Sequence, residues 1–263
     1  MKRKITAIAL CAVMFATAII GGTLAYFTDT EAVTNTMAVG NISINIEELA
    51  KQSDGTYAPF KNNEFMLFPM SNVDGANKAN KVVITMNDSP SGKPAYIRTF
   101  LLFEANEKVE ACDDDCCVGG LHFSYYQGYG DSYLGNELKD YGVTSKRLFD
   151  RDTTVTVGDK EYYAVLCENS EKKAIAVNEG LAALKSVWMD KDVTQEQAEG
   201  WGNDGVQILA FSQAIQAEEL TYEEAMKALD GTNGITVDYI ENLFTHNKNN
   251  ATINDFVKVE VNK

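Results

Sequence analysis

The feature that most constrains this chain is a change of pattern between residues 5 and 46. Residues 5–20 carry no charge and are almost entirely apolar. Gly21 and Gly22 then interrupt the run, and residues 42–46 read Ile-Ser-Ile-Asn-Ile. That alternation is typical of a strand with one buried face. We therefore expect a processed leader, followed by a folded domain whose first regular element is a strand.

Residues 1–25 have the organisation of a cleaved signal peptide. Residues 2–4 form a short positive head ahead of the apolar run. As a helix that run would rise about 24 Å, short of the roughly 30 Å of a bilayer core. Thr23 and Ala25 are small residues at the spacing that signal peptidase accepts. We expect cleavage after Ala25, which makes Tyr26 the mature N-terminus.

Composition favours one β-rich domain after processing. The 263-residue chain is 45% hydrophobic, which is enough for a substantial core and argues against disorder. Twelve Tyr and twelve Phe, with recurring Thr and Val, favour strands over helices.

The net charge excludes some partners. The chain carries −15, and residues 1–25 contribute three positive charges and no acid, so the mature form carries −18. Such a surface repels phosphate backbones and anionic lipid. We expect no nucleic-acid partner, and contact with a membrane only through the uncleaved signal.

The junction itself resembles a known family. Residues 21–30 read Gly-Gly-Thr-Leu-Ala-Tyr-Phe-Thr-Asp-Thr, and Asn35, Met37, Gly40 and the strand at 41–46 follow. This arrangement resembles the TasA/camelysin family, exported proteins of Gram-positive bacteria that are cleaved by a SipW-type signal peptidase. The resemblance implies a jelly-roll β-sandwich located in the extracellular matrix or at the cell surface. It also implies biofilm fibres in which the mature N-terminal segment of one subunit adds as a strand to the next.

The segment 26–39 is the candidate donor-strand arm. It is extended-prone and has no evident partner within the sequence, so pairing with a neighbour's open sheet edge would satisfy its backbone. A loose or self-packed N-terminus is the alternative, because chain termini are commonly poorly tied down. The arm residues proposed for donation are Ala32, Val33, Thr34, Asn35, Thr36 and Met37.

We predict a mainly β fold, a jelly-roll-like antiparallel β-sandwich over residues 40–263 with short helical insertions, preceded by the signal-peptide helix. Insertions are expected near 105–150 and 218–250. Strands are predicted at 81–87, 94–104, 153–157, 161–166, 206–217 and 255–261. By composition residues 174–189 could form a helix, but the resemblance favours a strand at 174–177, a turn at 178–180 and a strand at 181–189. Capping boxes at Thr194 and Thr221 predict short helices, and a third is expected at 237–244.

Four cysteines remain in the mature chain, and outside the cell four cysteines allow two disulfides in three connectivities. Because Cys116 and Cys117 are adjacent, we expect one to close a loop with Cys112 and the other to reach Cys167. A metal site made from cysteine and the acids at 113–115, or free thiols, are the alternatives.

Catalytic motifs are scarce in the sequence. The two histidines, His122 and His246, are far apart and form no His-Glu-x-x-His. Residues 150–161 mimic the ligand spacing of a calcium loop, but Val155 occupies the position where that loop needs glycine. We therefore predict that the chain is not an enzyme and that it uses no metal or cofactor.

The predicted function is that of an exported structural protein, a subunit of a matrix or cell-surface fibre that assembles by N-terminal strand donation. Its expected partners are the SipW-type signal peptidase, further copies of itself and other matrix proteins. A monomeric secreted adhesin or binding module is the alternative, with the Tyr- and Gly-rich residues 122–133 as a recognition loop. A camelysin-like secreted protease is a third reading.

Overall fold

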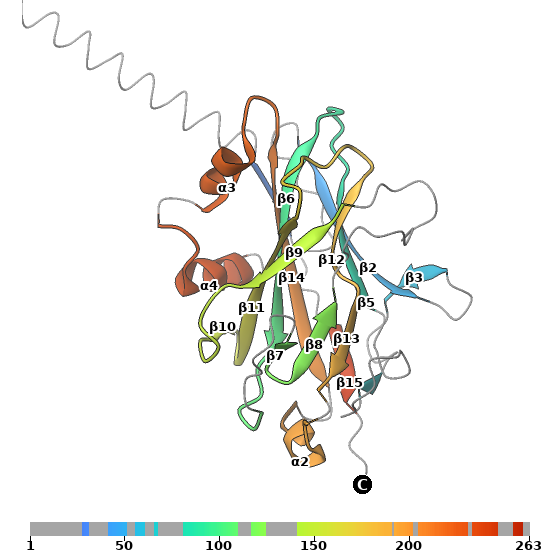
Figure 1. Ribbon diagram of the computed structural model, residues 1–263, viewed down its shortest axis with the longest axis vertical. Helices are drawn as coiled ribbons and strands as arrows, with labels where there is room; N and C mark the ends of the chain where they lie inside the picture. The colour runs from blue at the N-terminus through green and yellow to red at the C-terminus, as the bar shows by residue number, and fades with distance from the viewer. Residues whose placement is uncertain are drawn as a thin grey trace, which may run out of the picture.

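Two mainly antiparallel sheets pack face to face, and a small third sheet continues them at one end (Figure 1). The predicted mainly β fold with few short helices is confirmed. The computed structural model describes residues 28–31, 42–51, 56–60, 66–67, 81–109, 117–124, 141–190, 192–201, 205–230, 233–246 and 255–259.

The larger sheet is organised around two long neighbouring strands, β6 (Ala95–Glu104) and β14 (Val206–Gln216). They pair antiparallel, from Ile208 opposite Phe103 to Gln216 opposite Ala95. Nearly every residue of both strands is buried, which explains why their sequences are mainly apolar and do not alternate. The other strands of this sheet are β1 (Thr28–Glu31), β4 (Met66–Leu67), β9 (Val143–Arg147), β10 (Val155–Val157), β11 (Lys160–Asn169) and β15 (Asp255–Val259).

The strands β11, β6 and β14 lie side by side at the centre of the larger sheet. Each outer edge of this group of three pairs with two short strands. β11 pairs with β6, and its far edge is shared by β10 and β9. The free edge of β14 is likewise shared by β15 at Val206–Ile208 and by β1 at Ser212–Ile215. β4 extends the sheet by a parallel pairing with β15. The edge of β14 is therefore completed by the two ends of the chain.

The second sheet has the order β12-β5-β2-β3 and covers the inner face of the first (Figure 1). Ile42, Ile44 and Ile46 are all buried in the core between the sheets, as their alternation predicts. The four strands of this sheet are β2 (Ile44–Lys51), β3 (Tyr57–Pro59), β5 (Lys81–Asn87) and β12 (Gly180–Leu184).

A buried hydroxyl cluster joins the two sheets. Thr85 of β5 lies 3.1 Å from Thr99 of β6 and 2.6 Å from Ser212 of β14, measured between side-chain oxygens. Thr99 and Ser212 lie 2.9 Å apart, and none of the three residues is exposed. Each hydroxyl is thus satisfied by the other two, which buried polar groups require.

Helices cover the outer face of the larger sheet. Ile240 and Phe244 of α4 (Val237–His246) pack in a second buried cluster that includes Phe100 and Phe211. α3 (Tyr222–Asp230) packs its apolar side against the end of β14. The helices predicted after Thr194 and Thr221 are both present, the first as α2 (Gln195–Ala198) with a complete capping box and a following 3-10 turn, η1 (Glu199–Trp201).

Several predicted boundaries differ from the structure. Of residues 174–177 only Ile175 makes a bridge, with Ala95, and so no strand forms there. Residues 143–147 lie within the stretch expected as an insertion, yet they form β9 of the larger sheet. None of the described helices combines the length and apolarity needed to cross a bilayer.

Candidate functional site

A tight hairpin brings a cysteine opposite a histidine. β7 (Cys117–Val118) and β8 (Leu121–Ser124) pair so that Cys117 faces His122 across the ladder. Gly119 and Gly120 form the connection with φ values of 53° and 78°. Two successive positive φ values define the two-residue turn that matches the twist of a hairpin, and glycine adopts them without strain.

The hairpin is also packed too closely for other residues at its turn. A Cβ atom at Gly120 would lie 2.5 Å from Val109 Cγ1 and 2.8 Å from Val193 Cγ2. At Gly119 it would lie 2.5 Å from the ring of Tyr163. The local sequence therefore fixes the hairpin both by backbone conformation and by packing.

β13 (Ser186–Met189) adds an acid to the site from the other side of β8. Trp188 pairs with His122, and their rings stack at 5.4 Å between centroids with 6° between planes. Asp190 follows the strand, and its backbone N–H donates to the carbonyl of Gly120 at 2.8 Å. Its Oδ2 contacts His122 Nε2, and its Oδ1 accepts from the backbone N–H of Asp192 at 2.8 Å. The position of the carboxylate is thus set by two backbone contacts.

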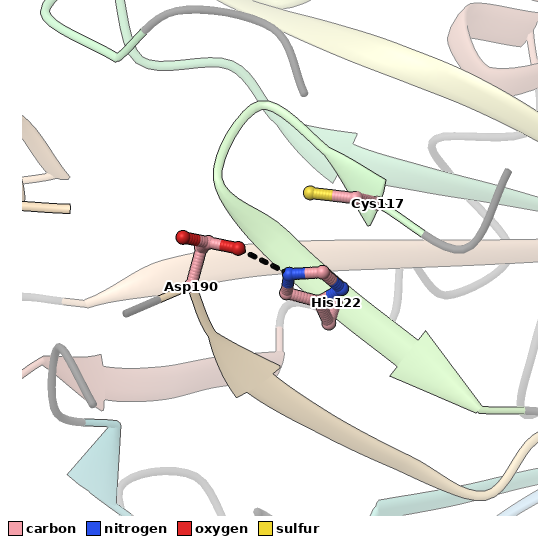
Figure 2. Close-up of side chains that lie close together, drawn as sticks. All are labelled: Cys117, His122 and Asp190. Carbon is pink, nitrogen blue, oxygen red and sulfur yellow. Dashed lines mark hydrogen bonds and ion pairs between the residues drawn. The ribbon is translucent and has the colours of Figure 1, made fainter. Parts of the chain in front are cut away.

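Cys117, His122 and Asp190 converge on a common space beside the hairpin (Figure 2). Their sulfur, nitrogen and oxygen ligand atoms all lie within 4.8 Å of one another. Cys117 is fully buried, whereas the side chains of His122 and Asp190 are 14% and 23% exposed. Such a mixture of thiolate, imidazole and carboxylate is the donor set that zinc prefers.

Cys117 is disulfide-bonded in the structure. The other cysteine that the structure describes, Cys167, is a free thiol, so the partner of Cys117 lies outside the described residues. Cys112 and Cys116 also lie outside them. The sulfur of Cys117 cannot act as a thiolate ligand while this bond is intact.

The predicted disulfide through Cys167 is wrong. Cys167 is a free thiol with no exposed surface, in the core between the sheets. Its Sγ donates to the carbonyl of Ala183 at 3.6 Å, and burial raises the pKa of the thiol. Cys167 lies opposite Thr99 in the β11–β6 ladder, and its side chain is part of the core between the sheets.

The edge of β14 is the second candidate site. Thr28–Glu31 pairs antiparallel with Ser212–Ile215 of the same chain, from Thr28 opposite Ile215 to Glu31 opposite Ser212. The expectation that the arm has no partner within the chain is therefore wrong for these four residues. The proposed donor residues Ala32, Val33, Thr34, Asn35, Thr36 and Met37 lie outside the described residues, as do the cleavage-site residues Thr23, Ala25 and Tyr26.

Residues 150–161, which mimic the ligand spacing of a calcium loop, form a turn followed by a β-hairpin. Val155–Val157 pairs with the start of β11 in a hairpin, as the alternation in this stretch indicates. Beside it lies an open pocket of about 440 Å³ whose lining includes Arg151, Asp152, Glu161 and Tyr163. The pocket thus mixes charges of both signs.

The N-terminal part of the chain matches a known family. Residues 1–52 match the family described as camelysin metallo-endopeptidase. The predicted resemblance to the TasA/camelysin family is thereby confirmed over this stretch. The prediction that the chain is not an enzyme is contradicted, because the matching family is named for a peptidase activity. A search of curated proteins gave no match.

Sequence reasoning considered His122 as a site residue only at the start of a recognition loop at 122–133, whereas the structure places it in β8, and it missed Asp190 altogether. The segment Cys-Val-Gly-Gly-Leu-His at 117–122 contained a usable signal, because a Gly-Gly turn between two-residue strands places Cys117 and His122 opposite each other. Asp190 is 68 positions from His122 in sequence, and only the β8–β13 pairing brings it close.

Proposed function

We propose that the mature protein is an exported subunit of an extracellular fibre that assembles by exchange of β1 between neighbouring chains. The observation that carries this proposal is the antiparallel pairing of Thr28–Glu31 with β14. It identifies an edge that accepts the N-terminal strand. β1 begins two residues after the expected new N-terminus at Tyr26, so processing would release the strand from the leader.

Exchange of an identical strand has little thermodynamic cost. The arm of a second molecule makes the same ladder with Ser212–Ile215 that the resident arm makes, so no hydrogen bond is lost. Residues 32–41 connect β1 to the fold, and ten residues can span at most roughly 35 Å. This reach allows the arm to bridge two subunits, and head-to-tail repetition of the contact would produce an open fibre.

A cysteine pair across the ladder would test the proposal. Asp29 lies opposite Ala214, and directly opposed residues in an antiparallel ladder have the Cα separation that a disulfide needs. The chain beginning at Tyr26 would carry Asp29→Cys and Ala214→Cys and be oxidised both as dilute monomer and after assembly. We expect bonds within one chain in the monomer and bonds between chains in the fibre, read on a non-reducing gel.

Asp29→Cys alone is the matched control for random oxidation. Fibres that contain only bonds within single chains would refute strand exchange. Failure of the chain to assemble under any condition would refute the fibre itself.

A metal-dependent endopeptidase is the second candidate function. The description of the family matched by residues 1–52 and the cluster of Cys117, His122 and Asp190 support it. Three protein ligands with a fourth position open to water are typical of catalytic zinc sites, where the metal activates a water molecule. With Cys117 in a disulfide, the cluster offers only two protein ligands, so this activity would require the reduced chain.

Casein hydrolysis with and without chelator would test the second candidate. We expect the reduced chain to lose activity with chelator and with His122→Ala, whereas His246→Ala is the control. Activity that survives both chelator and His122→Ala would exclude this site as its source.

A further inference from the structure

We propose that Cys117, His122 and Asp190 form a zinc site that is switched by the redox state of Cys117. When the Cys117 disulfide is intact the site is closed to the metal, and reduction completes it. The proposal rests on the convergence of the three ligand atoms, which lie within 4.8 Å of one another, and on the disulfide that occupies one of them. It depends on neither strand exchange nor peptide hydrolysis.

The distances between ligand atoms are close to those of a tetrahedral zinc site. Metal–ligand bonds of about 2.0–2.3 Å place neighbouring ligands roughly 3.3–3.6 Å apart. From separations of up to 4.8 Å, the more distant ligand atoms need to close by about 1 Å. The ligand atoms of His122 and Asp190 are in contact and need to move apart to admit the metal. The His122–Asp190 contact would be replaced by bonds from the same two atoms to the metal.

The surroundings orient the ligands before a metal arrives. Trp188 stacks on the imidazole of His122 and so restricts the plane of the ring. The backbone N–H of Asp192 donates a hydrogen bond to Oδ1 of Asp190. The other carboxylate oxygen of Asp190, Oδ2, therefore remains directed at His122. Contacts of this kind around metal ligands commonly affect affinity by about 10- to 100-fold.

Reduction can proceed by ordinary thiol–disulfide exchange. A thiolate of an external dithiol attacks the disulfide of Cys117 and forms a mixed disulfide, and the second thiol of the reagent then displaces the remaining cysteine. Two electrons and two protons pass to the protein, which gains two thiols, while the dithiol becomes a cyclic disulfide. Binding of Zn²⁺ then releases the thiol proton of Cys117, because only the thiolate is a ligand.

Zinc titration of the mature chain in two redox states would test the proposal. One sample is kept oxidised. The other is reduced with a water-soluble phosphine, which takes up the oxygen of one water molecule as phosphine oxide while the disulfide becomes two thiols. We expect one Zn²⁺ per reduced chain and at least about 100-fold weaker binding to the oxidised chain, measured by competition with a chromophoric chelator. In the reduced chain Co²⁺ should give a thiolate-to-metal charge-transfer band in the near ultraviolet.

Matched variants assign the ligands. We expect His122→Ala and Cys117→Ser to weaken binding to the reduced chain by at least about 100-fold and Cys117→Ser to abolish the charge-transfer band. The controls His246→Ala and Cys167→Ala should bind as the unmodified chain does, and near-ultraviolet circular dichroism would verify that each variant is folded.

Three outcomes would overturn the proposal. These are equal affinity in the oxidised and reduced chains, no binding to the reduced chain, or full binding by folded Cys117→Ser. Zinc binding without casein hydrolysis would support this site and reject the peptidase, and neither result bears on the cross-linking test of strand exchange.

Discussion

Removing Asp230 should destabilise the fold more than removing its buried partner Arg98. Arg98 of β6 is 1% exposed, and its guanidinium contacts Asp230 at the end of α3. Its Nε donates to Gln213 at 2.8 Å, and its Nη2 donates to Tyr239 at 3.3 Å. The guanidinium also lies 5.1 Å from the ring centre of Phe100. Strand β6, strand β14 and both outer helices therefore meet at one buried cation.

The size of each loss in stability depends on which charged group of the ion pair remains after the substitution. Asp230→Ala leaves the guanidinium buried without its counter-charge, and a change of this type costs about 3–5 kcal/mol in a dry interior. Because the Asp230 side chain is 33% exposed, water can partly replace it, and we expect about 2–3 kcal/mol. Arg98→Met removes the charge and leaves an acid that water reaches, so we expect about 1 kcal/mol. The double variant should resemble Arg98→Met alone.

Urea unfolding of the two single variants and the double variant would measure these differences, provided that the dependence on urea is unchanged. The exposed pair of Lys172 and Glu223, 3.0 Å apart, is the matched control, and Glu223→Ala should leave the unfolding midpoint almost unchanged. The reasoning is refuted if Asp230→Ala costs less than Arg98→Met or if the two effects add.

Three further predictions concern single positions. Cys167, buried and with a raised pKa, should resist iodoacetamide in the native protein and react only after denaturation, as measured by mass spectrometry. Burial, and secondarily Asp88, raise the pKa of Glu47, so its contribution to stability is present in acid and is lost as pH rises through that pKa. Glu47→Gln should therefore raise the free energy of unfolding at neutral pH by less than about 1 kcal/mol, seen as a higher unfolding midpoint. In acid the substitution should give no gain in stability. Gly120→Ala should lower thermal stability by more than about 1 kcal/mol, because alanine is strained at its φ of 78° and meets Val109.

The strongest sequence patterns predicted the elements at the centre of the fold. β5, β6 and β14 are long apolar runs bounded by turn residues, and the capping boxes at Thr194 and Thr221 define helix starts by purely local hydrogen bonds. Elements of this kind carry their own signal, because length, periodicity and caps are local properties of the chain.

Features that depend on strand pairing were not accessible in the same way. Both faces of β11 are buried around Cys167, so the sequence pattern does not tell which face its side chain is on. Only the β11–β6 register shows that the thiol faces the core. The general preference of exported proteins for disulfides therefore led to the wrong partner. The pairing of Thr28–Glu31 with β14 could not be predicted for the same reason. All four residues are polar, so the sequence has no hydrophobic pattern that indicates which strand they pair with.

The division of the β14 edge limits how the proposed assembly could work. β15 holds Val206–Ile208, so departure of β1 would expose only the Ser212–Ile215 half of that edge. A short exposed edge offers little template for unspecific pairing with other sheets. The arm that pairs with this edge has the same sequence whether it comes from the same chain or from the next one. The hydrogen bonds of the ladder therefore favour neither the closed monomer nor the exchanged fibre. Protein concentration and the reach of residues 32–41 would then decide between monomer and fibre, because they set the effective concentration of the resident arm. Shortening that connection should shift the balance towards assembly if it strains the closed monomer, and lengthening it should favour the monomer.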